Sequence, residues 1–217
     1  MNSTTPQDVS QHASATSNAT GLIVVRHGES EWNVLGKWQG RANTQLTDAG
    51  RAQAAEAAQR ILDLGIAIDH IVASSLTRAH ETALIIAECL GVEQVHVDER
   101  LVETDVGPWE GLREHEIEAA YPNYLRDRRT PPNFEAPDAV FTRATKALHD
   151  AMMRSRQSLV VSHSGVIRTI RRVMQVHDRR LHNLEGCYFA TDGTGRLQAG
   201  DFVSLSAHTR ATMNDSV

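Results

Sequence analysis

Long apolar runs are missing from this chain: none approaches the roughly 20 residues that a transmembrane helix requires. A secretory signal is missing too, because the first 20 residues have neither a positively charged region nor an apolar one. Cysteine is scarce, and Cys89 and Cys187 each lie in an apolar pattern typical of small core residues. Together these features favour a cytoplasmic protein with no membrane association.

Positive charge is in deficit, with a formal net charge of -5 at pH 7 and a pI of about 6.1. This balance argues against nucleic acid or an anionic membrane as a partner. Any anion that the protein binds must therefore be held by a local cluster of side chains. The sequence gives no indication of an oligomeric state.

Motifs for metal and nucleotide binding are absent as well. The chain has 11 histidines but no His-Glu-x-x-His and no Cys-x-x-Cys, so neither a metal nor another cofactor is expected. Gly36-Lys37 is followed by Trp38 instead of serine or threonine, which excludes a P-loop.

The length of 217 residues suits one domain, and 41% hydrophobic and 23% charged residues are typical of a globular protein. Residues 1–20 are rich in small and polar residues and are predicted to be a disordered tail. Residues 209–217 are similar and are predicted to fray. A single domain is predicted over residues 21–208.

Short apolar runs alternate with helical patterns between the two tails. Strands are predicted at Leu22–Val25, His70–Ser74, Val95–Val97, Ser158–Ser162, Leu184–Thr191 and Leu197–Ser204. Helices are predicted at Thr47–Leu64, Leu76–Leu90, Leu112–Tyr121, Asp138–Arg156 and Val166–Val176. This alternation favours an α/β protein with a parallel or mixed sheet covered on both faces. The irregular segment Arg126–Pro137 is a candidate lid over a site.

Two of the predicted strands end in the same way. The first runs into Arg26-His27-Gly28, and a later one runs into His163-Ser164-Gly165. In open α/β sheets, ligands bind beyond the carboxyl ends of the strands, so these side chains are expected to meet over one crevice. Two imidazoles and a guanidinium are suited to holding a phosphate group and attacking it.

Arg78 falls in the first turn of a predicted helix, where a cation opposes the helix dipole at a cost of roughly a few tenths of a kcal/mol. An anion held there by Arg78 and by free N–H groups explains this placement. A solvated surface arginine is the alternative. His27 is predicted to attack phosphorus through a neutral ring nitrogen, because nearby guanidinium groups disfavour the charged imidazole.

An alcohol leaving group needs a proton, and Glu103 is the expected donor because its apolar neighbours raise its pKa. Glu99, Asp105 and Glu110 are rivals that spacing alone does not exclude. An ordinary surface carboxylate at position 103 also stays open on these grounds.

Five segments resemble motifs of the histidine phosphatase superfamily, also called phosphoglycerate mutase-like, and they follow the family's order. They are Arg26-His27-Gly28-Glu29-Ser30-Glu31-Trp32-Asn33, Leu46–Gln53, Ser74–Ala79 with Thr82, Leu101–Gly111 and Ser162–Gly165. The resemblance spans Leu22 to Val203. It implies a three-layer α/β sandwich with a mostly parallel central sheet and a phosphohistidine mechanism without a metal.

The resemblance also implies roles for single residues, and the choice of Glu103 over its neighbours rests mainly on it. The catalytic residues would be His27 as the nucleophile, Glu103 as the proton donor, and His163. The phosphate would be bound by Arg26, Arg78, His163 and Asn33, with Gln39 as a weaker contact of the substrate.

The segment after Glu103 indicates a phosphatase. Val106 stands where the mutase branch has a tyrosine, and no lysine occurs between Lys37 and Lys146, where mutases have one. Arg128-Arg129 partly reproduces an arginine pair of the mutases and is predicted to contact the substrate beyond its reacting phosphate. The prediction is a phosphomonoesterase that acts on a small phosphorylated substrate. A mutase and a non-catalytic phospho-ligand-binding module are the alternatives.

Overall fold

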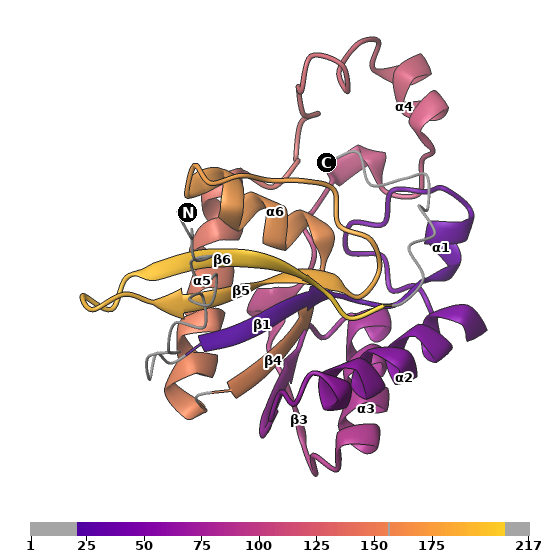
Figure 1. The fold of residues 1–217 in the computed structure, drawn as a ribbon. Helices are drawn as coiled ribbons and strands as arrows, with labels where there is room; N and C mark the ends of the chain where they lie inside the picture. The colour runs from indigo at the N-terminus through magenta and orange to yellow at the C-terminus, as the bar shows by residue number, and fades with distance from the viewer. Residues whose placement is uncertain (1–20, 156, 207–217) are drawn as a thin grey trace, which may run out of the picture.

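A computed structural model describes residues 21–155 and 157–206 (Figure 1), so both predicted tails lie outside the described residues. The central sheet has the strand order β3-β2-β4-β1-β5-β6. Its strands are β1 (Gly21–Arg26), β2 (His70–Ala73), β3 (Val95–Val97), β4 (Gln157–Ser162), β5 (Glu185–Thr191) and β6 (Leu197–Ser204). Parallel pairing joins β3, β2, β4 and β1, whereas β5 runs antiparallel to β1 and to β6. The predicted mostly parallel sheet is confirmed.

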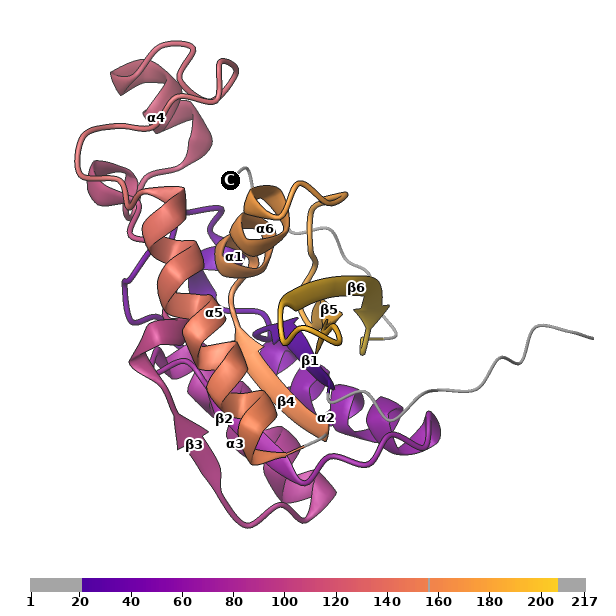
Figure 2. The same ribbon diagram turned by 90° about the vertical axis from the view of Figure 1, so that its left-hand side faces the viewer.

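Helices cover both faces of this sheet. They are α5 (Pro137–Arg154) and α6 (Ser164–Val173) on one face, and α2 (Asp48–Asp63) and α3 (Thr77–Leu90) on the other. Figure 2 shows α5 and α2 on opposite sides of β4. Alternate residues of β1 pack into the two hydrophobic cores. Leu22 and Val24 pack on the side of α5 and α6, and Ile23 and Val25 pack on the side of α2 and α3. Burial on both faces explains the continuous apolar runs, and the three-layer sandwich is confirmed.

Two predicted helix boundaries have an identifiable physical cause. Thr47 caps α2, because its Oγ1 accepts the N–H of Gly50 at 3.0 Å. Helix α3 ends at Gly91, whose φ of 71° lies in the left-handed region that favours glycine. Within the described ranges, no helix has the length and apolarity needed to cross a membrane.

The prediction for Cys89 is wrong, whereas the prediction for Cys187 is confirmed. Cys187 is buried in β5, but Cys89 is exposed near the end of α3. Ile86 and Ala87 face the core, and the helical rotation of about 100° per residue turns Cys89 toward solvent.

Residues 105–135 and Trp38 form a separate packing unit, which we call the aromatic lobe. It contains η2 (Gly107–Trp109) and α4 (Glu114–Ala120), and α4 stands apart from the sheet in Figures 1 and 2. The Trp109 ring meets Trp38 edge-on at 4.9 Å between centroids, and Phe134 at 5.8 Å. The sequence predicted a helix here but not this packing. It also missed the short helices α1 (Glu31–Val34) and η1 (Glu99–Leu101).

Candidate active site

The carboxyl ends of β1 and β4 bring the two predicted histidines together. The strands are parallel neighbours with Arg26 in register with Ser162, so the residues that follow them meet at one edge of the sheet. The N–H of His27 bonds the carbonyl of Ser162 at 3.1 Å, and the ring centroids of His27 and His163 are 5.3 Å apart. Both rings are buried.

The hydrogen bonds of His27 determine which ring nitrogen carries the proton. Nδ1 lies 2.6 Å from the carbonyl oxygen of Gly28, which only accepts, so Nδ1 is the protonated nitrogen. Nε2 lies 3.1 Å from Nε of Arg78, which only donates, so Nε2 holds the lone pair. Burial, and then the charges of Arg78 and Arg26, lower the pKa of His27 well below its usual value. His27 is therefore a neutral imidazole whose electron pair on Nε2 accepts a hydrogen bond from Arg78.

Arg78 is fully buried in the first turn of α3. Its other two nitrogens donate to the carbonyls of Ala42 at 2.7 Å and Gly40 at 2.9 Å. Burial lowers its pKa to about 10, so the guanidinium stays charged at neutral pH. Because these three bonds use three of its five N–H donors, two remain for a ligand. The surface alternative for Arg78 is wrong.

Several buried polar groups near His27 lack a partner among the described residues. Nε2 of His163 bonds Oγ of Ser74 at 2.8 Å, but its Nδ1 bonds nothing described. The hydroxyls of Thr104 and Ser164 also have no hydrogen-bond partner among the described residues, and both line the cavity in front of His27. Unsatisfied buried polar groups are rare in proteins, so the two hydroxyls at this cavity indicate a polar ligand, whereas His163 is not among the residues that line it.

Glu103 also lines this cavity, with its carboxylate against the start of α6. One carboxylate oxygen accepts the N–H of Thr104 at 2.7 Å, and the other accepts the N–H of Gly165 at 3.1 Å. A Cβ at Gly165 would lie 2.4 Å from the first oxygen, so only glycine admits the carboxylate here. Burial raises the pKa of Glu103, although the two N–H bonds and Arg78 oppose the rise.

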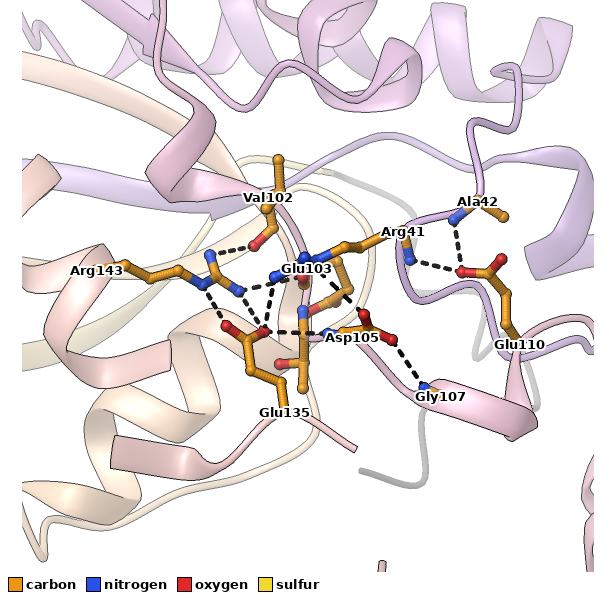
Figure 3. Close-up of polar contacts among 10 residues, drawn as sticks. Arg41, Ala42, Val102, Glu103, Asp105, Gly107, Glu110, Glu135 and Arg143 are labelled. Atoms are coloured by element: carbon orange, nitrogen blue, oxygen red, sulfur yellow. Dashed lines mark hydrogen bonds and ion pairs between the residues drawn. The ribbon is translucent and has the colours of Figure 1, made fainter. Parts of the chain in front are cut away.

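The rival carboxylates are engaged elsewhere (Figure 3). Asp105 accepts the N–H of Gly107 at 2.9 Å, and Glu110 accepts the N–H groups of Arg41 and Ala42, each at 2.9 Å. Glu99 bonds the hydroxyl of Ser75. None of the three lines the cavity in front of His27.

Two cavities adjoin at this edge of the sheet. The catalytic cavity, of about 60 Å³, is lined by Arg26, His27, Arg78 and Glu103 among others. The second, of about 560 Å³, has walls that include Arg128, Arg129 and Phe134 of the aromatic lobe. Trp38 and Arg168 line both cavities, so the two cavities share part of their walls.

The two weaker contacts predicted from the resemblance have different surroundings. Gln39 lines the catalytic cavity, with its side-chain oxygen accepting bonds from the hydroxyls of Ser30 and Thr44. Asn33 is buried outside that lining. Its side-chain oxygen accepts from the N–H and hydroxyl of Ser30, and from Nδ2 of Asn183.

A family model described as the histidine phosphatase superfamily (branch 1) matches residues 22–190. The chain belongs to the histidine phosphatase superfamily. Membership confirms the resemblance, and relatives named as phosphatases confirm the expected enzyme class, a phosphoric monoester hydrolase.

Curated relatives of this histidine phosphatase include enzymes named for different substrates. Phosphoglycerate mutase-like protein 4 of Arabidopsis thaliana is 37% identical over 158 residues, which are 69% of this chain and 68% of that protein. Phosphoserine phosphatase 1 of Hydrogenobacter thermophilus is 34% identical over 157 residues, which are 69% and 73%. Among solved structures, mycobacterial glucosyl-3-phosphoglycerate phosphatase has a TM-score of 0.75 at 25% identity and covers 86% of this chain and 100% of its own.

Sequence reasoning missed some side chains of this histidine phosphatase site. Ser74 follows β2 as His27 follows β1, so the rule for strand ends was sufficient to find it. Arg168 lies four residues after Ser164 on α6, and residues with this spacing share one helix face. The signal for Thr104 was weaker, because it stands in an irregular loop.

Proposed function

We propose that this protein is a metal-independent phosphomonoesterase that carries the phosphoryl group on Nε2 of His27. The observation that carries the proposal is the protonation of this ring, with a donor Nδ1 and an electron pair on Nε2. A nucleophile of this kind splits ester hydrolysis into two easier steps.

In the first step, Nε2 of His27 forms a bond to phosphorus as the bond from phosphorus to the alcohol oxygen breaks. Arg26 and the two remaining donors of Arg78 bind the phosphate oxygens and stabilise the charge that spreads over them. Nδ1 of His163 and the hydroxyl of Ser164 gain the partners that they lack among residues 21–155 and 157–206. These buried guanidinium groups supply the positive charge that a metal supplies elsewhere.

Glu103 gives its proton to the departing alcohol oxygen, which is favoured by the raised pKa of a buried carboxyl. In the second step, the resulting carboxylate takes a proton from water. The water oxygen attacks phosphorus, the bond from phosphorus to Nε2 breaks, and the electron pair returns to His27. The products are an alcohol and inorganic phosphate, and the enzyme is restored.

The substrates are small phosphorylated metabolites whose leaving group enters the larger cavity. Its walls combine the rings of Trp38, Trp109 and Phe134 with four arginines and one aspartate. Asp178 pairs with Arg168 and Arg172, which leaves Arg128 and Arg129 to face an anion. This chemistry suits an anionic alcohol of appreciable size. Both cysteines are free thiols, which is consistent with a cytoplasmic location.

A mutase is the second candidate, because Arg128 and Arg129 lie beside the catalytic cavity. Hydrolysis is favoured because buried Val106 lines the catalytic cavity at the position where mutases have a tyrosine. Product analysis separates the two: a phosphatase releases inorganic phosphate, whereas a mutase returns an isomeric phosphate ester.

The decisive test is mass spectrometry of the protein quenched during turnover of p-nitrophenyl phosphate. A phosphate that is labile to acid is expected on His27 and is absent in His27→Ala. Activity is expected to survive EDTA. An unmodified His27 with full turnover contradicts the covalent mechanism, and loss on chelation with rescue by Mg²⁺ or Zn²⁺ contradicts metal independence. An intact fold that neither turns over nor becomes phosphorylated identifies a binding module.

A further inference from the structure

Glu135, at the end of the aromatic lobe, joins several loops at the active site (Figure 3). Its carboxylate accepts two bonds from Arg143 of α5, at 2.8 and 2.9 Å, and the backbone N–H of Asp105 at 3.1 Å. The backbone N–H of Glu135 in turn donates to the carbonyl of Asp105 at 2.8 Å. Asp105, the second residue after Glu103 in the chain, is thus held next to Glu135.

Arg143 reaches from α5 to the backbone on the other side of Glu103. One terminal nitrogen donates to the carbonyls of Arg100 and Val102 at 2.8 and 2.6 Å, and the other donates to the carbonyl of Glu103 at 3.1 Å. Arg143 and Glu135 are both mostly buried, so water competes little for these bonds. A single guanidinium therefore holds the backbone of Glu103 and of the residues that precede it.

The same carboxylate also reaches the loop that holds Arg78. Glu135 pairs with Arg41 at 3.3 Å, and Glu110 accepts the backbone N–H groups of Arg41 and Ala42. The carbonyl of Ala42 is in turn an acceptor for Arg78. Glu135 thus contacts two loops: the one that carries Glu103, and the one containing Arg41 and Ala42, whose carbonyl accepts a bond from Arg78.

We propose that Arg143 and Glu135 are positioning residues that hold Glu103 at the distance from the leaving oxygen at which it transfers its proton. The proposal rests on the proposed function, in which Glu103 is the proton donor. The planar fork of an arginine is needed, because an ammonium group cannot make three carbonyl bonds and a bidentate ion pair at once. A carboxyl group displaced by about 1 Å loses roughly a hundredfold in rate.

The test compares an alkyl phosphate, whose departure needs a proton, with p-nitrophenyl phosphate, whose departure does not. Arg143→Gln and the isosteric Glu135→Gln are expected to lower the rate of phosphorylation of His27, measured before the first turnover is complete, roughly ten- to hundredfold for the alkyl ester. Both are expected to lower the burst rate of p-nitrophenol release from the aryl ester only slightly, whereas its steady-state kcat also falls because Glu103 is the base of the second step. Arg143→Lys is expected to restore little. Arg51→Gln, which breaks an ion pair with Glu81 between α2 and α3, is the matched control and leaves both rates unchanged.

A double mutant separates positioning from general damage. In a Glu103→Gln background, Arg143→Gln is expected to cause no further loss with the alkyl ester, because both changes remove the same proton transfer. Equal losses on the two esters, or additive losses in the double mutant, overturn the positioning role. If Glu103→Gln alone does not distinguish the esters, the proton donor of the proposed function is wrong. Because Glu135→Gln preserves shape, it keeps the test decisive should Arg143→Gln fail to fold.

Discussion

The edge of the central sheet and the aromatic lobe hold functional side chains by different means. At the sheet edge, hydrogen-bonded strand pairing fixes the places of His27 and His163, and two helical layers bury the strands. In the lobe, Arg128 and Arg129 stand in irregular backbone that is held by aromatic rings and by the ion pair of Glu135 with Arg143. In the proposed function, the first region positions the reacting phosphate and the second contacts the group attached to it. That proposal assigns chemistry and specificity to separate parts of the chain.

The strongest test of this division is His27→Ala, which removes the nucleophile from the sheet edge. We expect kcat to fall by a factor on the order of 10⁴ or more for every phosphate ester, because no other group can carry the phosphoryl intermediate. The matched control is His115→Ala, an exposed histidine on α4, which should leave activity intact. Retention of more than a few per cent of activity by a folded His27→Ala protein would show that another group is the nucleophile.

The next test uses pH, because the pKa values of Glu103 and His27 are shifted in opposite directions. Burial raises the pKa of Glu103 and lowers that of His27. Turnover of an alkyl ester needs protonated Glu103 and neutral His27. Its kcat/KM, which reports the ionising groups of the free enzyme, should therefore fall as pH rises through the raised pKa of Glu103, and the acid limb should lie well below the usual range of histidine.

Glu103→Gln should remove the limb at high pH and depress alkyl ester turnover by roughly 10² to 10⁴. With p-nitrophenyl phosphate the expected trace is a burst of p-nitrophenol followed by slow turnover, because the base of the second step is lost. Asp105→Asn and Glu110→Gln are the controls. If either of these gives the burst while Glu103→Gln behaves like the wild type, the proton donor has been assigned to the wrong residue.

Trp109→Ala tests the lobe by itself. The side chain is 2% exposed and contacts Trp38 and Phe134, so its loss leaves a large cavity. Turnover of a bulky anionic ester should fall roughly tenfold or more, while phosphorylation of His27 by a small aryl ester falls less. Hydrogen exchange should increase in the lobe but not in β1 or β4. Uniform loss of protection across the sheet would mean that the two regions fold as one cooperative unit.

Arg128→Ala combined with Arg129→Ala should have the smallest effect. Exposed ion pairs contribute about 0.2–1 kcal/mol each, so KM for an anionic ester should rise by a factor of roughly 1.4 to 5 per arginine, with kcat nearly unchanged. KM for p-nitrophenyl phosphate should change less. Arg126→Ala, in the same segment but outside the cavity wall, is the control. Equal changes in KM for both esters would identify the pair as solvated surface charges.

The sequence was sufficient for the layers of the fold and for the centre of the site, because both follow from local periodicity. Leu22–Val25 shows a buried strand and leads straight into Arg26 and His27, and the same pattern places His163. The pairing of Arg143 with Glu135, the contact of Trp38 with Trp109, and the presence of Arg168 at the junction of two cavities depend on long-range packing. A local sequence pattern does not predict such long-range contacts. The prediction that Cys89 lies in the core was wrong for a related reason, because apolar neighbours in the sequence do not show which side of a helix faces inward.

Trp38 belongs at once to the core of the lobe and to the walls of both cavities. A ligand that fills the larger cavity therefore adds contacts to the ring on which the lobe packs, and mass action converts its affinity into conformational stability. A substitution of Trp38 that adapts the larger cavity to a new leaving group also changes the packing of the lobe. A substitution at Trp38 is therefore expected to change both the substrate range and the stability of the lobe. A substitution at Arg128 can change the substrate range alone.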